Sequence, residues 1–163
     1  MERIADYVIL LGAQRLRETA RMSVAVELVR RIIELTDRGN FRARERLIHP
    51  DCEIVMSGAG RLTRAELTRY SQTFATAFPR SEHIIDWDLE VDGSVVVEGT
   101  WTATQTGPFE TPQGRIPATG RTMRTRFCMI CQVRHGRAIS IHGYWDQLEL
   151  LQQLGLVAEP ARL

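Results

Sequence analysis

The stretch RTMRTRFCMICQVRHGRAISIHGYW, residues 121–145, decides the fold because it holds two long strand-like runs joined by one tight turn. The two runs, 121–134 and 137–145, are rich in β-branched and aromatic residues. Between them, His135-Gly136 is a residue pair that favours a two-residue hairpin turn. The sequence therefore predicts two long antiparallel strands near the end of the chain.

The same pattern continues on the N-terminal side of this hairpin. Residues 82–91 and 94–106 alternate as strands do, and Asp92-Gly93 joins them in a second tight turn. Residues 106–120 contain three prolines and three glycines, which predicts a long irregular connection. Four long antiparallel strands must curl to bury one face, and the space beneath a curled sheet is a natural pocket.

The front half of the chain is helical in pattern. Residues 1–22 carry apolar residues at helical spacing, and Ser23 caps a clearer helix that Gly39 ends. Thr63 and Glu66 form a capping box, the usual start of a helix. The remaining expected elements are a short helix over 41–47, a brief strand over 52–56, a helix to residue 78 after Thr63, and a short closing helix over 146–154.

Composition excludes several classes of function. The chain has 163 residues, a net charge of +1 and no lysine. The interleaved charges offer no field for nucleic acid, so we expect no such partner. The missing lysine excludes Schiff-base catalysis. No apolar run approaches the ~20 residues that cross a bilayer, and we expect a cytoplasmic protein with no membrane partner.

Metal and cofactor motifs do not occur either. The sequence has no metalloprotease, calcium-loop or phosphate-loop pattern, so we expect no metal and no cofactor. Cys128 and Cys131 have a spacing that suggests zinc, but residues three apart on a strand point to opposite faces. They are therefore expected to be ordinary strand residues with reduced thiols.

Several short motifs carry a resemblance to a known family. In order and spacing they resemble the SnoaL-like polyketide cyclases, which share a cone-shaped fold with ketosteroid isomerases and nuclear transport factors. The motifs are HPD at 49–51, PATGR at 117–121, VRHGR at 133–137, YWDQL at 144–148 and LQQLGL at 151–156.

The resemblance implies an α+β fold in which a cone-shaped, curved antiparallel sheet wraps around three N-terminal helices. An extra N-terminal helix and a short C-terminal helix complete it. On this basis residues 1–22 are expected to form a helical extension, 23–157 the single SnoaL-like domain, and 158–163 a C-terminal tail. The implied activity is ring closure or a related proton transfer on a small, apolar, polyketide-like ligand.

The residues that carry out proton transfer in the family are replaced here. The family places a His and an Asp on its last two strands, and these positions fall at Met129 and Gly143. The base of the steroid isomerases falls at Met56. None of these three residues exchanges a proton, so the resemblance implies the family's pocket without its usual acid and base.

Period-two alternation identifies the side chains that are expected to bind the ligand. On the two last strands one face reads as apolar, and Trp101 on an earlier strand is expected to join it. The expected substrate-binding residues are Met56, Trp101, Phe127, Met129, Cys131, Ile141, Gly143 and Trp145. His83 and Trp87 on the first long strand could also reach this pocket, although a tryptophan on such a strand is more often core and a lone histidine more often structural.

Three polar residues at the end of the last strand are the predicted catalytic groups. His142, Tyr144 and Asp146 share one side of the strand by their two-residue spacing. A catalytic role requires the strand to twist near Gly143. The alternatives are an outer-face histidine and, for Asp146, a helix N-cap.

Three functions remain open from the sequence. The first is a SnoaL-like cyclase or isomerase of secondary metabolism, and the second is a non-catalytic binding or chaperoning module of the same fold. The third is an epoxide hydrolase-like enzyme, which needs paired carboxylates and an arginine in the cavity. We also expect a homodimer that pairs through the outer sheet face, where Ile130 and Tyr144 would lie.

Overall fold

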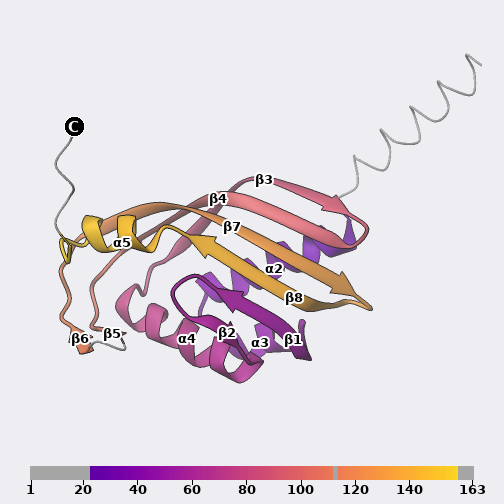
Figure 1. Cartoon of the computed structure of the whole chain (residues 1–163), viewed down its shortest axis with the longest axis horizontal. Helices are drawn as coiled ribbons and strands as arrows, with labels where there is room; N and C mark the ends of the chain where they lie inside the picture. Colours follow the sequence, from indigo (N-terminus) through magenta and orange to yellow (C-terminus); the bar gives the residue numbers. More distant parts are fainter. Residues whose placement is uncertain (1–22, 112–113, 158–163) are drawn as a thin grey trace, which may run out of the picture.

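A computed structural model describes residues 23–111 and 114–157 (Figure 1). The predicted N-terminal extension, 1–22, and the tail, 158–163, lie outside these described residues. The helices are α2 (Val24–Asp37), α3 (Phe41–Glu45), α4 (Arg64–Ala77) and α5 (Gln147–Gln153). The strands are β1 (Ile48–Met56), β2 (Gly60–Leu62), β3 (Glu82–Val91), β4 (Ser94–Thr104), β5 (Phe109–Thr111), β6 (Gly114–Ile116), β7 (Thr122–Arg134) and β8 (Arg137–Trp145).

Six strands form one sheet in the order β2-β1-β8-β7-β4-β3. The four long strands β3, β4, β7 and β8 pair antiparallel in sequence order, as predicted. Both predicted turns are present: Asp92 and His135 have φ of 50°, and each precedes a glycine with positive φ. Strand β1 adds to the other edge of β8 in parallel, which the sequence pattern did not indicate.

The sheet bends because its strands do not stay in register. Asp86 is an extra residue between the pairs Ile85–Gly99 and Trp87–Glu98, and Ile139 is an extra residue on β8. Such bulges bend a strand and increase its twist. Gly99 allows the bend on β4, because a Cβ there would lie 2.2 Å from the carbonyl oxygen of Ile84.

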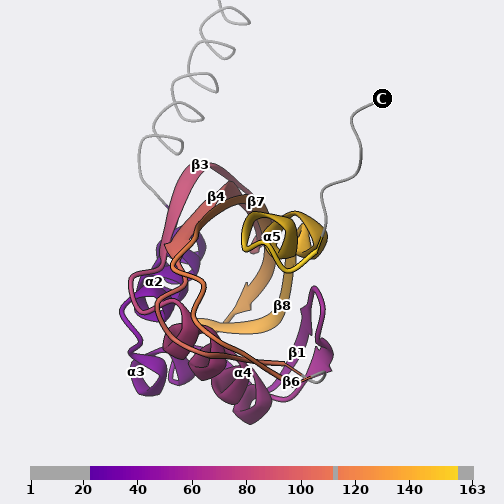
Figure 2. The same ribbon diagram turned by 90° about the vertical axis from the view of Figure 1, so that its left-hand side faces the viewer.

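The helices pack against the concave side of this bent sheet (Figure 2). Helix α2 begins at Ser23, whose side chain accepts a hydrogen bond from the Val26 amide, and α4 begins with the predicted capping box of Thr63 and Glu66. The core joins the apolar face of α2 to the inner face of the sheet. Its most buried members include Val29, Phe78, Val95, Val97, Met123 and Ile141.

The α+β class, the curved antiparallel sheet and the helices that it wraps are as expected. The connection between β4 and β7 differs, because it contains the small β5–β6 hairpin rather than irregular chain alone. The bulge at Ile139 also changes which residues face inward at the start of β8: Ala138 is fully buried there and Ile139 only partly. No helix within 23–111 and 114–157 is long and apolar enough to cross a membrane.

We expect Gly99→Ala to destabilise the protein by about 1–3 kcal/mol, the usual range for overpacking. The added methyl group would meet the Ile84 carbonyl and, at 2.8 Å, the Phe127 ring. Urea unfolding measures the effect, with Ser94→Ala on the same strand as the control. A Gly99→Ala variant as stable as Ser94→Ala would contradict this role for Gly99 in the bend.

Candidate functional site

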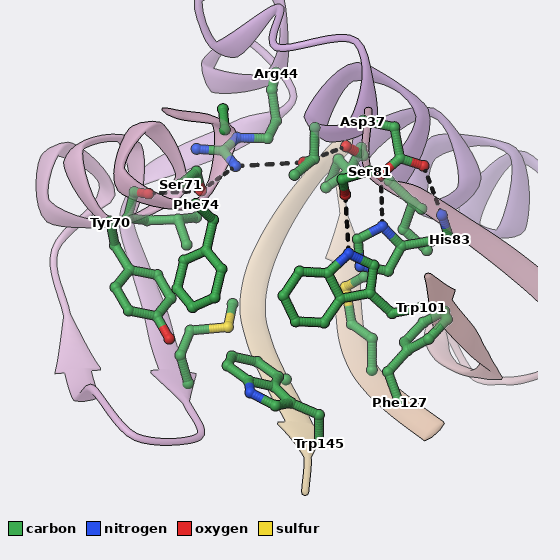
Figure 3. A pocket seen from close by; sticks show the side chains of 18 of the residues that line it. Asp37, Arg44, Tyr70, Ser71, Phe74, Ser81, His83, Trp101, Phe127 and Trp145 are labelled. Carbon is green, nitrogen blue, oxygen red and sulfur yellow. Dashed lines mark hydrogen bonds and ion pairs between the residues drawn. The ribbon is translucent and has the colours of Figure 1, made fainter. Parts of the chain in front are cut away.

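A cavity of about 270 Å³ lies between the concave face of the sheet and helices α2 and α4. Its walls come from the C-terminal half of α2, one face of α4, the end of β1, and strands β3, β4, β7 and β8. Figure 3 shows side chains from these elements converging on the same space. The cavity is the predicted pocket beneath the curled sheet.

A cluster of aromatic rings forms one part of the cavity wall. The Phe74 ring on α4 lies 5.5 Å from Trp101 and 6.4 Å from Trp145 between ring centroids, and the two tryptophans are 6.1 Å apart. Phe78 and Phe127 extend the wall on either side. Such surfaces favour a flat, largely apolar ligand.

The predicted ligand-binding residues are placed largely as expected. Met56, Trp101, Phe127, Met129, Ile141, Gly143 and Trp145 all line the cavity. Cys131 does not line it: its side chain is fully buried in the core. That prediction followed the alternation of β7 correctly, but the cavity ends before Cys131.

The positions Met56, Gly143 and Met129 lie side by side in one row across β1, β8 and β7. The space over Gly143 is filled by Met56, since a Cβ at Gly143 would lie 2.7 Å from the Met56 sulfur. The space that Gly143 leaves is therefore occupied by the Met56 side chain and does not enlarge the cavity. The row is apolar, as the sequence predicted.

The titratable pair of the cavity is His83 with Asp37. Nδ1 of His83 lies 2.6 Å from Oδ1 of Asp37, and the His83 backbone amide donates to Oδ2 at 3.0 Å. The imidazole ring is parallel to Trp101 at 5.5 Å and edge-on to Phe127 at 4.9 Å. These contacts from three sides hold the ring in one orientation (Figure 3).

Asp37 determines which nitrogen of His83 is free. A carboxylate at Nδ1 favours the tautomer with its proton on that atom, which leaves Nε2 as the acceptor. Within the described part of the chain, Nε2 makes no hydrogen bond. An oriented imidazole with one free nitrogen in an apolar cavity can accept and return a proton.

Sequence reasoning missed this pair because its members are 46 positions apart. Asp37 ends α2, where it reads as part of a helix stop, and His83 is near the start of β3. The sequence did name His83 as a residue that could reach the pocket, and the structure pairs it with Trp101 across β3 and β4. No pattern in the sequence brings the end of α2 to that point.

Arg44 is the second charged group in the wall. It lies on α3, is 2% exposed and lines the cavity beside Thr36 and Ser71. Its Nη1 donates to the hydroxyls of Ser71 at 2.7 Å and Thr36 at 3.3 Å. Burial lowers the pKa of Arg44 to about 10, and the sequence analysis did not select it.

The predicted catalytic residues do not meet in the cavity. Asp146 caps α5, where its carboxylate accepts from the Glu149 amide at 2.9 Å. His142 points from the outer face towards Glu53, 3.9 Å away. Tyr144 is 44% exposed on the same face and is the one member of the three that borders the cavity. This geometry favours a helix cap for Asp146 and an outer-face position for His142.

Two further expectations concern metals and epoxide chemistry. Within 23–111 and 114–157, no group of three or more His, Cys, Asp or Glu side chains could hold a metal ion. Among the described residues Asp37 is the only carboxylate that lines the cavity, so the carboxylate pair of an epoxide hydrolase is not present there. Arg126 is on the outer face, where it pairs with Asp86 and Glu98.

Comparison with known proteins supports the fold and the family. The model of a family described as SnoaL-like polyketide cyclase matches residues 26–154. A search of curated proteins finds no match.

Many solved structures have the same fold. AclR from Streptomyces galilaeus, a proposed hydroxylase, superposes with a TM-score of 0.74 at 17% identity, over 86% of this chain and 91% of that one. IdmH from Streptomyces antibioticus, a proposed polyketide cyclase, superposes with a TM-score of 0.70 at 20% identity, over 80% of this chain and 98% of that one. A proposed polyketide cyclase from Acidithiobacillus ferrooxidans superposes with a TM-score of 0.70 at 25% identity, over 83% of this chain and 97% of that one.

The placement of Cys131 generates a test by thiol labelling. Burial raises the pKa of the Cys131 thiol to about 12 and that of Cys52 to about 11, so both stay protonated and inert at pH 8. We expect iodoacetamide to leave both unmodified in the folded protein and to modify both in urea. Peptide mass mapping locates the label, and rapid native labelling of Cys131 would place it in the open cavity instead.

Proposed function

Since the chain belongs to the SnoaL-like polyketide cyclase family, we propose that it catalyses proton transfer on a small, largely apolar, polyketide-like ligand in this cavity. The reaction class is the ring closure or isomerisation of a ligand with an enolisable carbonyl group. The observation that carries the proposal is the His83–Asp37 pair, which faces the aromatic cavity. The pair takes the place of the family's usual acid and base, whose positions are Met129 and Gly143 here.

In the proposed mechanism Nε2 of His83 acts first as the base. It accepts a proton from the carbon beside a carbonyl group, and the C–H electron pair moves into an enolate. Asp37 stabilises the imidazolium through Nδ1, and the Trp101 face beside the ring does so as well. The positive charge on the His83 ring therefore forms beside the Asp37 carboxylate and the Trp101 face, which already stabilise it.

The second step returns the proton. The enolate carbon attacks a second carbonyl group of the same ligand, a carbon–carbon bond forms, and the new alkoxide takes the proton from Nε2. No oxidant, reductant or other reactant is consumed. The aromatic walls assist by folding the ligand so that the two reacting carbons approach each other.

A non-catalytic binding module is the second candidate function. The apolar row of Met56, Gly143 and Met129 favours it, because the positions used for acid and base in the family are inert. In that case the cavity would bind and shield its ligand, and His83 would be a structural residue stacked on Trp101.

We expect His83→Gln to lower catalysis by at least about 100-fold, the usual contribution of a general base. Exchange of the α-protons of 1-tetralone with deuterated solvent, followed by NMR, measures proton transfer without knowledge of the natural substrate. Asp37→Asn should also lower the rate, since it removes the charge that stabilises the imidazolium.

His142→Gln and Asp146→Asn are the matched controls for this experiment. His142 lies on the outer face, and Asn can replace Asp146 as a helix cap. Both should exchange 1-tetralone at the wild-type rate. Loss of activity in the controls but not in His83→Gln would return the catalytic role to the last strand, and binding of 1-tetralone without catalysed exchange in the wild type would favour the binding module.

We also propose that the chain forms a homodimer through the outer face of the sheet. Large apolar side chains line up across the strands on this face: Leu89 pairs with Val96, and Val96 with Ile130. Trp87, Leu89, Ile130 and Tyr144 are each between 41% and 55% exposed. A contiguous apolar surface of this kind on a sheet is typical of an interface between subunits.

We expect Ile130→Asp to separate the dimer, because a charge in this apolar row would be desolvated without a partner. Light scattering should give twice the 18.6 kDa chain mass for the wild type and the single mass for the variant. Val24→Asp is the control, since Val24 is 75% exposed on α2, away from this face. A wild-type monomer at micromolar concentration would contradict the proposed interface.

A further inference from the structure

Arg44 is a buried cation that lacks an ionic partner among the described residues. Its guanidinium group contacts the hydroxyls of Thr36, Ser71 and Thr68, and its Cζ lies 5.0 Å from the centre of the Phe41 ring. Within 23–111 and 114–157, no carboxylate lies within ion-pair distance of it. Nε is buried and has no hydrogen-bond partner there.

The nearest negative charge is indirect. Glu45 accepts a hydrogen bond from the Thr68 hydroxyl at 2.5 Å, and that hydroxyl is 3.4 Å from Nη2 of Arg44. One hydroxyl therefore separates the two charges. A guanidinium group taken out of water is costly unless an anion compensates it closely, and burial already lowers the pKa of Arg44.

Arg44 is also close to the proposed proton-transfer pair along the chain. Thr36 accepts a hydrogen bond from Arg44, and the next residue, Asp37, accepts one from His83. Several polar groups of the cavity thus lie near the C-terminal end of α2, and Figure 3 shows Arg44 and Asp37 on the same side of the aromatic rings.

We propose that Arg44, held in place by the hydroxyls of Ser71 and Thr36, binds a carboxylate group of the ligand. The inference rests on the proposed function for the cavity ligand and narrows its class to polyketide-like acids with a free carboxylate. Bound in this way, the carboxylate holds one end of the ligand at α2, the carbon skeleton lies against Phe74, Trp101 and Trp145, and a carbonyl group along the skeleton comes near His83.

The surroundings fit a carboxylate better than a phosphate. A guanidinium group matches the planar carboxylate in shape and offers paired donors. A dianionic phosphate would need further cations, and the only other one among the described lining residues is Arg38, which pairs with Glu34 at 2.7 Å. Asp37 would moreover repel the second negative charge.

The test compares two probes of the same shape, 2-naphthoate and 2-naphthamide. Calorimetric titration of the wild type should give about tenfold or more tighter binding of the carboxylate, the usual gain of a charge-assisted hydrogen bond. Arg44→Gln should bind the two probes about equally. Arg44→Lys, which keeps the charge but loses the planar donors, should retain part of the preference.

His83→Gln separates this inference from the proposed function. The variant should still prefer 2-naphthoate, because His83 is not the proposed anion site, although it should have lost α-proton exchange. A preference that disappears in His83→Gln and persists in Arg44→Gln would assign anion binding to the imidazole and overturn the proposal. If the wild type prefers 2-naphthoate but does not catalyse α-proton exchange of 1-tetralone, the anion site is upheld and the proposed catalysis is overturned.

The wild type and Ser71→Ala decide the matter even if Arg44→Gln does not fold. Ser71→Ala keeps the charge of Arg44 but removes the hydroxyl that accepts its Nη1 hydrogen bond at 2.7 Å and positions the guanidinium group, so it should weaken 2-naphthoate binding more than 2-naphthamide binding. Equal binding of the two probes by the wild type, or an unchanged preference in Ser71→Ala, overturns the proposed site.

Discussion

The bend of the main sheet is the constraint on which the cavity depends. A straight sheet of this length would pack flat on α2 and α4 and leave no space for a ligand. The bulge at Asp86 and the close approach of Gly99 to the Ile84 carbonyl curve the strands instead. The same bulge lies between His83, which faces inward to Trp101, and Trp87, which is exposed on the outer face. One local irregularity therefore shapes the cavity and orients both faces of β3.

Within the cavity, apolar and polar functions are separated in space. Aromatic rings form a cluster in the wall, while Asp37, His83, Arg44 and Ser71 supply charged and polar groups. This separation suits a ligand that is flat and apolar along its length and polar at one terminus. A low-dielectric wall also strengthens the interaction of Asp37 with His83. Because Met56, Gly143 and Met129 carry no ionisable group, the proposed proton transfer is assigned to the polar end of the cavity.

Local patterns in the sequence predicted most of the fold and the apolar half of the site. Turn residues such as Asp92-Gly93, the capping box at Thr63 and strict alternation in β7 are each determined by neighbouring residues, and all are present as predicted. The polar half depends on contacts between distant segments, which no local pattern encodes. His142, Tyr144 and Asp146 were selected because they are close in sequence, whereas Asp37 and His83 meet only when α2 packs across β3. Cys131 was misplaced because alternation gives the face of a residue but not the depth of the cavity.

The central claim is that Asp37 holds His83 in the tautomer that leaves Nε2 free in the cavity. Long-range ¹H–¹⁵N NMR spectra of the imidazole rings test it most directly, at a pH where the rings are neutral and with His83→Gln to assign the signals. The account predicts that Nδ1 of His83 carries the proton and that Asp37→Asn changes the balance between the two tautomers. A His83 ring protonated on Nε2 in the wild type would contradict the account, because the nitrogen facing the ligand could then accept no proton.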